Sequence, residues 1–252
     1  MSFRRHTREQ GRAMLLELVE KFRENSKYYK SEEYLEADCR AEFVNKMLEA
    51  LNWDVGNESG VAPQYREVVM EAQVEGEDAV NHPDYSLCIG GNPIVFVEAK
   101  APSVKVLDAK EYALQLRQYG FDSGKAISVL TDFEEFAVYD TRKAPAENDD
   151  AGVSRVKYIT YDKYGIEFDY LWDTFSHDAV TKGSVDTYFE NKTGKYSKND
   201  VNDDILEAVE EWRTLLVKGA KSKDWRLSET NINMAVQRLI NRFVYIWRTK
   251  GY

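Results

Sequence analysis

The sequence predicts an α/β fold built on a mixed β-sheet, with the core order αβββαβ. Two amphipathic helices come first, three strand-like segments follow, and a third helix separates these from two more strands. Because helices and strands mix in this way, we expect helices packed against one sheet. The chain has 252 residues, enough for one large or two small domains.

The helices are predicted from apolar side chains that recur at helical spacing. The first helix, 7–24, carries Leu15, Val19 and Phe22, and the second, 34–51, ends at the breakers of 52–56. A third helix is expected at 106–120, where Gly120 closes it. Further helices are predicted at 201–219 and 228–248.

The strands are predicted from alternating or continuously apolar runs. Residues 84–89 alternate and lead into Gly90-Gly91-Asn92-Pro93, which is typical of a hairpin turn. Residues 94–99 are continuously apolar apart from Glu98, as expected for a central strand that is buried on both faces. The other strands are expected at 66–74, 125–131 and 135–140, with a further one inside the aromatic-rich segment 155–175.

Composition narrows the class of protein. The longest apolar run, 94–97, is too short to cross a bilayer, and the basic N-terminus lacks the apolar core of a secretory signal. We therefore expect a cytoplasmic protein with no membrane partner. Two cysteines and three scattered histidines give neither a disulfide framework nor a zinc site.

The net charge of −10 is unusual for a protein that acts on nucleic acid. The acidity is concentrated, since residues 31–100 carry 15 acidic side chains against four basic ones. A domain of this charge should bind DNA poorly alone and need a metal ion or other parts of a protein to hold it there.

Two acids and a lysine are expected to meet at one edge of the sheet. Asp84 begins one strand, and Glu98 and Lys100 end the next. A tight turn between antiparallel strands brings the start of the first beside the end of the second. Because side chains alternate along a strand, Glu98 and Lys100 share a face.

This group suits a hard cation. Mg²⁺ prefers carboxylate, carbonyl and water oxygens, which Asp84, Glu98 and the backbone carbonyl of Ala99 can supply. The metal, with Mn²⁺ as a substitute, would polarise a phosphodiester and lower the pKa of a bound water. Lys100 would orient or help deprotonate that water and stabilise charge on the phosphate. The turn acids Asp132, Glu134 and Glu135 are instead expected to be solvated.

The pattern Pro83-Asp84 … Glu98-Ala99-Lys100, within an αβββαβ order, resembles the PD-(D/E)xK nuclease superfamily. The resemblance implies a restriction-endonuclease-like fold and adds Glu42, a helix acid that would join the metal cluster. The simpler interpretation of Glu42 is a solvated helix face. Gln115 and Tyr119 match a QxxxY motif that in the family approaches the DNA or the active site, although helix packing with a polar contact would also explain them.

Taken together, residues 35–140 resemble the N-terminal nuclease domain of type I restriction subunits and of type IIG restriction-modification fusions. This implies an N-terminal helix at 1–30, a nuclease domain at 31–175 and a helical connector at 176–252. Double-stranded DNA would be the substrate, and methyltransferase or specificity modules absent from this chain would be partners. Besides Tyr119, the residues expected to contact DNA are Arg117, Lys105, Lys110 and Lys125.

The alternative is a non-catalytic or truncated interaction module of a larger restriction-modification complex. The acidic surface and the lack of a recognition domain favour it. The intact set of Asp84, Glu98 and Lys100 favours an endonuclease, because a degenerate site should have lost one of them.

Overall fold

The structure is a computed structural model that describes residues 3–70, 83–189 and 219. The chain divides into two compact units, Met1–Phe189 and Glu190–Tyr252, and all the elements discussed here belong to the first. The helices predicted at 201–219 and 228–248 lie outside the described residues, apart from Gly219. No helix in the described part of the chain is long and apolar enough to cross a membrane.

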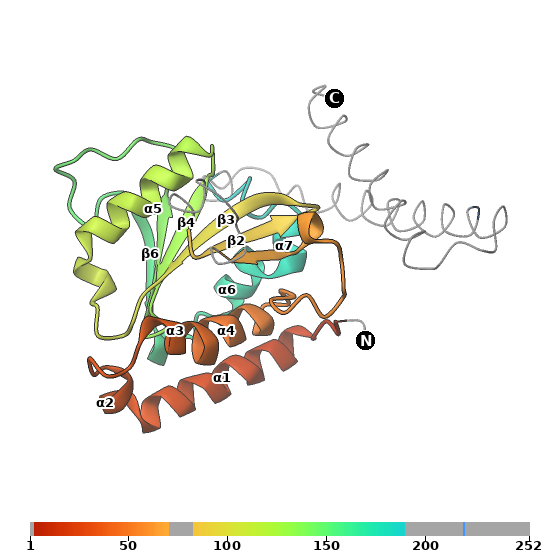
Figure 1. Cartoon of the computed structure of the whole chain (residues 1–252), viewed down its shortest axis with the longest axis horizontal. Coiled ribbons are helices and arrows are strands. Elements are labelled where there is room, and N and C mark those ends of the chain that lie inside the picture. Colours follow the sequence, from red (N-terminus) through yellow and green to blue (C-terminus); the bar gives the residue numbers. More distant parts are fainter. Residues whose placement is uncertain (1–2, 71–82, 190–218, 220–252) are drawn as a thin grey trace. The chain divides into compact units, whose positions relative to one another are not determined.

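Helices and strands follow the predicted order, with short helical turns between them (Figure 1). The α-helices are α1 (Arg8–Glu24), α2 (Ser26–Tyr29), α3 (Glu36–Cys39), α4 (Asn45–Ala50), α5 (Lys110–Asp122), α6 (Phe168–Phe175) and α7 (His177–Thr181). The shorter turns are the π-helical η1 (Arg40–Val44) and the 3-10 helices η2 (Pro63–Tyr65), η5 (Val106–Asp108) and η6 (Tyr161–Lys163). The strands are β1 (Val68–Met70), β2 (Tyr85–Ile89), β3 (Asn92–Ala99), β4 (Ile127–Thr131), β5 (Glu135–Asp140) and β6 (Arg155–Thr160).

The six strands form one mixed sheet in the order β1-β2-β3-β4-β5-β6. Among the strands of the described residues, only β3 and β4 pair in parallel, and α5 makes the crossover between them. All other neighbours are antiparallel. The predicted α/β fold with a mixed sheet is therefore confirmed.

Two apolar layers cover the sheet, one on each face (Figure 1). The larger layer packs α1, the α3–α4 segment and α6 against one face, and Leu15, Val19 and Phe22 bring α1 into that core. The smaller layer packs α5 against the other face, with Leu116 against Phe96 and Leu130. The N-terminal helix thus belongs to the same compact unit as the sheet.

A tight turn and a register shift together set how β2 pairs with β3. Gly90 and Gly91 both have positive φ, at 60° and 86°, as a two-residue type I′ turn requires. A Cβ atom on Gly91 would lie 2.3 Å from the backbone oxygen of Gln64, so only glycine fits there. The ladder then shifts by one residue between Cys88 and Leu87, so that Tyr85 pairs with Val97 beyond this irregularity.

The helix predicted at 34–51 differs in one respect. It runs from Glu36 to Ala50, but its middle turn, Arg40–Val44, is π-helical. Such a turn is wider than an α-helical turn, so it changes which side chains face the sheet. This change matters for the site.

Candidate active site at the end of β3

The hairpin brings Asp84 beside Glu98. Since Tyr85 pairs with Val97, the preceding residue Asp84 lies opposite Glu98 at the end of the ladder. The Asp84 carboxylate accepts a hydrogen bond from the backbone N–H of Ala99 at 2.8 Å. The Asp84 backbone N–H donates in turn to Glu98 Oε2 at 3.4 Å. The two carboxylates are therefore held together by the backbone of both strands.

Lys100 completes this group. Its Nζ lies 2.8 Å from Glu98 Oε1 and 3.8 Å from Asp84 Oδ2. The backbone N–H of Lys100 donates to the carbonyl of Thr131 on β4 at 2.9 Å, which extends the parallel pairing to this residue. The structure thus brings Asp84, Glu98 and Lys100 together, as the hairpin geometry predicts. Their roles in catalysis stay a prediction.

These three side chains are almost completely buried, with exposures of 6% for Asp84, 9% for Glu98 and 10% for Lys100. Burial raises the pKa of Glu98, and the charge of Asp84 adds to the rise against the opposing effect of Lys100. Burial lowers the pKa of Lys100, but the charges of Glu98, Asp84 and Glu36 outweigh it, so that this pKa is raised. Lys100 is therefore held as an ammonium.

Three contributors to the site were missed by the sequence analysis. Glu36 Oε2 lies 3.4 Å from Lys100 Nζ, and Arg40 Nη1 lies 2.6 Å from Asp84 Oδ1. The ring of Tyr112 on α5 lies under the Lys100 ammonium, 4.8 Å from its centroid. The available signal was the spacing of Glu36 and Arg40, which are four apart and so share a helix face.

The structure does not bring Glu42 to this group. Its carboxylate accepts from Lys21 Nζ on α1 at 2.6 Å, and the Glu42 side chain is 42% exposed. The reason is geometric: Glu42 comes two residues after Arg40, and residues two apart on a helix do not face the same way. Glu36 takes the place at the sheet edge that the family resemblance gave to Glu42.

The predicted QxxxY pair lies on α5. Gln115 Nε2 donates to the Tyr119 hydroxyl at 2.5 Å, so the two side chains contact each other as their spacing predicts. Gln115 is exposed and Tyr119 half-buried. Tyr112, one turn earlier on the same helix, contacts Lys100, while the side-chain hydrogen bond that Gln115 and Tyr119 make is to each other. A role for this pair at the DNA stays a prediction.

Two of the predicted DNA contacts are placed differently from the expectation. Arg117 is 2% exposed and pairs with Asp149 Oδ2 at 2.8 Å, because it faces inward beside Leu116 rather than into a cleft. Lys125 donates to the carbonyl of Pro93 at 2.5 Å. That contact lies near the start of β3, whereas Lys100 follows its end, so Lys125 does not flank the site.

Lys105 and Lys110 agree better with the prediction. They lie between Lys100 and the first turn of α5, where Lys105 is exposed and Lys110 half-buried. The nearby η5 turn is fixed to the start of β5, because Val106 N–H donates to Glu135 Oε2 at 2.6 Å. Since β5 starts where β4 ends, this segment lies at the same end of the sheet as Lys100. Of the predicted DNA contacts on lysine and arginine, only these two flank the site.

Two of the three turn acids are not solvated, which corrects the sequence expectation, whereas the third, Glu134, is half-buried and pairs with Lys30 at 2.6 Å. The Asp132 side chain is fully buried and Glu135 is 9% exposed. Asp132 Oδ1 accepts from Glu135 N–H at 2.6 Å, whereas its Oδ2 has no hydrogen-bond partner among the described residues. Burial raises the pKa of Asp132 well above its usual range, with the charges of Glu135 and Glu134 adding to the rise. Packing against β4 and β5, which a local pattern does not reveal, buries the turn.

We expect Asp132→Asn to make the protein less sensitive to rising pH. A carboxyl with a raised pKa contributes stability below its unfolded-state pKa and loses it as the pH rises through the folded-state value. Asparagine does not titrate, so the free energy of unfolding of the variant relative to wild type should increase from acidic to neutral pH. Urea unfolding across that range measures this difference. A difference that stays constant with pH would show that Asp132 ionises normally.

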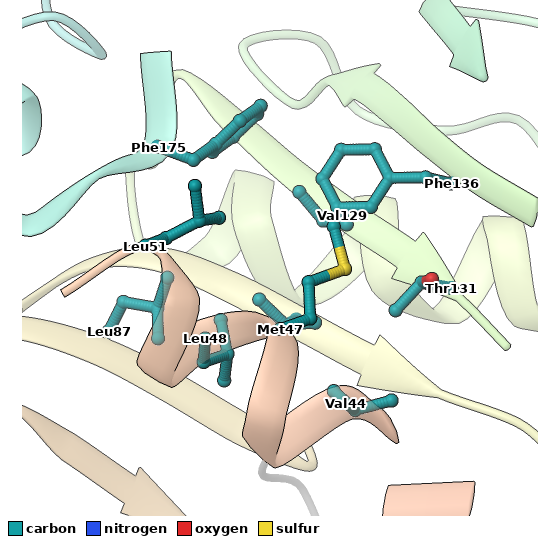
Figure 2. A pocket seen from close by; sticks show the side chains of 10 residues that line it. Val44, Met47, Leu48, Leu51, Leu87, Val129, Thr131, Phe136 and Phe175 are labelled. Carbon is teal, nitrogen blue, oxygen red and sulfur yellow. The ribbon is translucent and has the colours of Figure 1, made fainter. Parts of the chain in front are cut away.

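A small cavity of about 20 Å³ lies elsewhere, between α4 and the sheet (Figure 2). The lining is apolar, with side chains that include Met47, Leu51, Leu87 and Phe175, apart from Thr131, whose hydroxyl donates to the carbonyl of Glu135. A cavity of this size without polar partners stays dry. It is a packing gap in the larger core, and the carboxylates at the end of β3 do not line it.

The carboxylates suit a magnesium site of the kind that depends on substrate and water. Within the described residues, no group of three or more His, Cys, Asp or Glu side chains is arranged to hold a metal on its own. Mg²⁺, however, is usually bound through one or two carboxylates, several waters and substrate phosphates. Asp84, Glu98 and the Ala99 carbonyl match this donor chemistry.

The fold and this group of side chains define an α/β domain of the restriction-endonuclease-like class. Residues 66–147 match the family described as the type I restriction enzyme R protein N terminus. That segment contains Asp84, Glu98, Lys100, Gln115 and Tyr119. The chain therefore carries a domain of the restriction-enzyme N-terminal type, which confirms the resemblance seen in the sequence.

The chain is also similar to a named restriction enzyme. The Type II restriction enzyme and methyltransferase RM.Eco57I of Escherichia coli is 31% identical over 234 residues, which are 92% of this chain. The chain spans only 23% of the length of that relative, so the activities of the whole relative do not transfer directly. No solved structure matches the chain.

Proposed function

We propose that this chain is the metal-dependent DNA endonuclease part of a restriction-modification system and hydrolyses phosphodiester bonds. The observation that carries the proposal is the buried group of Asp84, Glu98 and Lys100 at the end of β3. Two carboxylates and a lysine, all nearly buried, are costly to maintain unless the group serves a purpose. Its place within a restriction-type domain supports DNA as the substrate.

The acidic and basic side chains of the site would have different roles. Asp84 and Glu98 would hold Mg²⁺, with the Ala99 carbonyl as a third oxygen ligand. The bound ion supplies an activated water and polarises the phosphate. Lys100, held as an ammonium by Glu98 and Glu36, would orient the attacking water and stabilise the charge that develops on the phosphate.

The charge balance of the site explains why a metal would be needed for DNA to bind. Glu36, Asp84 and Glu98 face two cations, Arg40 and Lys100, so the group has one excess negative charge. A phosphate would be repelled. A divalent cation reverses the sign and makes the site attractive to the DNA backbone. Lys105 and Lys110 would extend this attraction along the loop that follows Lys100.

The comparison also suggests what the chain works with. Its relative is, by name, both a restriction enzyme and a methyltransferase, and this chain spans a minor part of that length. We therefore propose that methyltransferase and recognition modules act together with this domain. Alone, the 252-residue chain should nick DNA weakly and without sequence specificity.

Incubation of the chain with supercoiled plasmid at low salt tests the proposal. We expect slow nicking with Mn²⁺, slower nicking with Mg²⁺ and none with EDTA. The ions should also raise the melting temperature, because a ligand that binds only the folded state stabilises it by about 2.7 kcal/mol at a hundred times its Kd.

The two readouts separate the candidate functions. A melting temperature unaffected by millimolar Mn²⁺ and Mg²⁺, together with no nicking, would favour a non-catalytic interaction module. Stabilisation by metal without nicking would place the missing requirement in a partner module. Cutting at one defined sequence by the chain alone would reveal a recognition element within it.

A further inference from the structure

Arg40 forms an ion pair with Asp84, one of the two carboxylates proposed to bind the metal. Its Nη1 lies 2.6 Å from Asp84 Oδ1, and its Nη2 lies 3.5 Å from the Asp84 backbone oxygen. The guanidinium also lies over the ring of Tyr85, 5.0 Å from its centroid. With a side chain that is 20% exposed, Arg40 is the more accessible partner of the pair, since Asp84 is 6% exposed.

The two oxygens of Asp84 are not equivalent. Oδ2 accepts from the Ala99 backbone N–H at 2.8 Å and lies 3.8 Å from Lys100 Nζ, so two groups of β3 already surround it. Oδ1 accepts from Arg40 Nη1. A cation that binds Asp84 would therefore meet Arg40 at Oδ1, and two cations on one oxygen repel each other.

The local backbone presents Arg40 to the site. Arg40 begins the π-helical turn of Arg40–Val44, and π turns inside helices occur frequently at functional sites. Glu36 and Arg40 both contact the carboxylate–lysine group, whereas Glu42 pairs with Lys21 on α1. The helix thus directs one acid and one base at the end of β3.

We propose that Arg40 is a phosphate-binding residue that Asp84 holds until a divalent cation takes that carboxylate. The inference rests on the proposed function and adds a residue to it. Released from Asp84, the guanidinium would turn toward the DNA backbone at the mouth of the site. Its planar fork matches two phosphate oxygens at once, which a lysine ammonium does not. Metal binding and DNA binding would then be linked through one side chain.

The first test is calorimetric titration of the full chain with Mn²⁺ in the absence of DNA. Arg40→Met removes the competing cation but keeps an apolar stem against Tyr85, so we expect metal to bind about tenfold more tightly, which corresponds to ~1.4 kcal/mol. Lys21→Met is the matched control, because it removes a lysine from another acid pair, that with Glu42. Its metal affinity should equal that of wild type.

The second test measures DNA binding, with Ca²⁺ as the ion and a short labelled duplex as the probe. Fluorescence anisotropy should show that Ca²⁺ tightens DNA binding by wild type and by Lys21→Met. In Arg40→Met this gain should fall by about fivefold or more, although the metal itself binds better. Arg40→Met should thus strengthen metal binding but weaken metal-dependent DNA binding. This combination distinguishes a phosphate contact that Asp84 masks from a general loss of positive charge.

Several outcomes would overturn the inference. Weaker metal binding by Arg40→Met would show that Arg40 supports Asp84 rather than competes for it. An undiminished Ca²⁺ gain in DNA binding would show that Arg40 does not reach phosphate. A wild-type chain that binds no divalent cation would remove the inference together with the proposed function. Should Arg40→Met fail to fold, Arg40→Gln carries both tests, since it removes the charge and the fork, and Arg40→Lys carries the DNA-binding test, since it keeps the charge and loses the fork.

Discussion

Lys100→Met should lower the rate of metal-dependent plasmid nicking by about 10²–10³-fold, the usual cost of removing one electrostatic stabiliser from an active site. The substitution removes the ammonium that lies 2.8 Å from Glu98 and 3.8 Å from Asp84. Methionine is unbranched and apolar, so it can still pack against the ring of Tyr112. The rate of conversion of supercoiled to open-circular DNA in Mn²⁺ measures the effect.

Two further measurements test whether the loss of nicking is specific to the role of Lys100. Lys46→Met removes a lysine that is 53% exposed and pairs with Glu49 on α4, so its nicking rate should be that of wild type. Calorimetry of Lys100→Met should show metal binding that is unimpaired, because the change removes a cation from beside the carboxylates. Nicking that survives Lys100→Met at the wild-type rate would indicate another active site or a contaminating nuclease.

The centre of the site was predictable because its determinants are local. A two-residue turn, Gly90-Gly91, fixes which end of β2 lies beside which end of β3. The alternation of side chains then puts Glu98 and Lys100 on one face. Asp84, Glu98 and Lys100 therefore meet as expected, although the exact pairing of Asp84 with Glu98 also depends on a register shift between Leu87 and Cys88 that the sequence analysis did not predict.

The helix contribution was not predictable in the same way. An α-helical reading of 34–51 does not contain the π turn at Arg40–Val44, and the orientation of each side chain depends on it. Glu42 and Glu36 are both acids on a polar helix face, so composition does not separate them. The structure separates them by partner, since Glu42 binds Lys21 and Glu36 reaches Lys100.

Buried charges away from the site were also beyond local patterns. Arg117 was expected to contact DNA, but its partner Asp149 comes from a loop more than 30 residues later in the chain. Asp132 was expected to be solvated, but the residues around the turn come from distant segments: Cys39 Sγ donates to its carbonyl at 3.3 Å, and the Tyr164 hydroxyl donates to the carbonyl of Phe133 at 2.7 Å. A charged residue in a turn or helix is exposed by default, and only tertiary packing overrides that default.

Trp53→Ala should be the most destabilising single change within 52–56, the segment that the sequence analysis identified only as the end of a helix. The Trp53 side chain is fully buried, and its Nε1 donates to the carbonyl of Phe175 at the end of α6 at 2.8 Å. Truncating a buried tryptophan costs about 3–5 kcal/mol. Because a domain has about 5–15 kcal/mol of stability in total, this loss is a large share of it.

A matched variant separates the two parts of this loss. Trp53→Phe keeps an aromatic ring but leaves the Phe175 carbonyl without its donor, so it should cost about 1–3 kcal/mol. Ile166→Ala truncates an apolar side chain that is 78% exposed and should change the free energy of unfolding by no more than about 0.5 kcal/mol. Thermal and urea unfolding of the three variants measure the order. If Trp53→Ala melted at the same temperature as wild type and Ile166→Ala did not, the packing of the segment after α4 against α6 would be wrong. The expected loss of stability depends on the burial of Trp53.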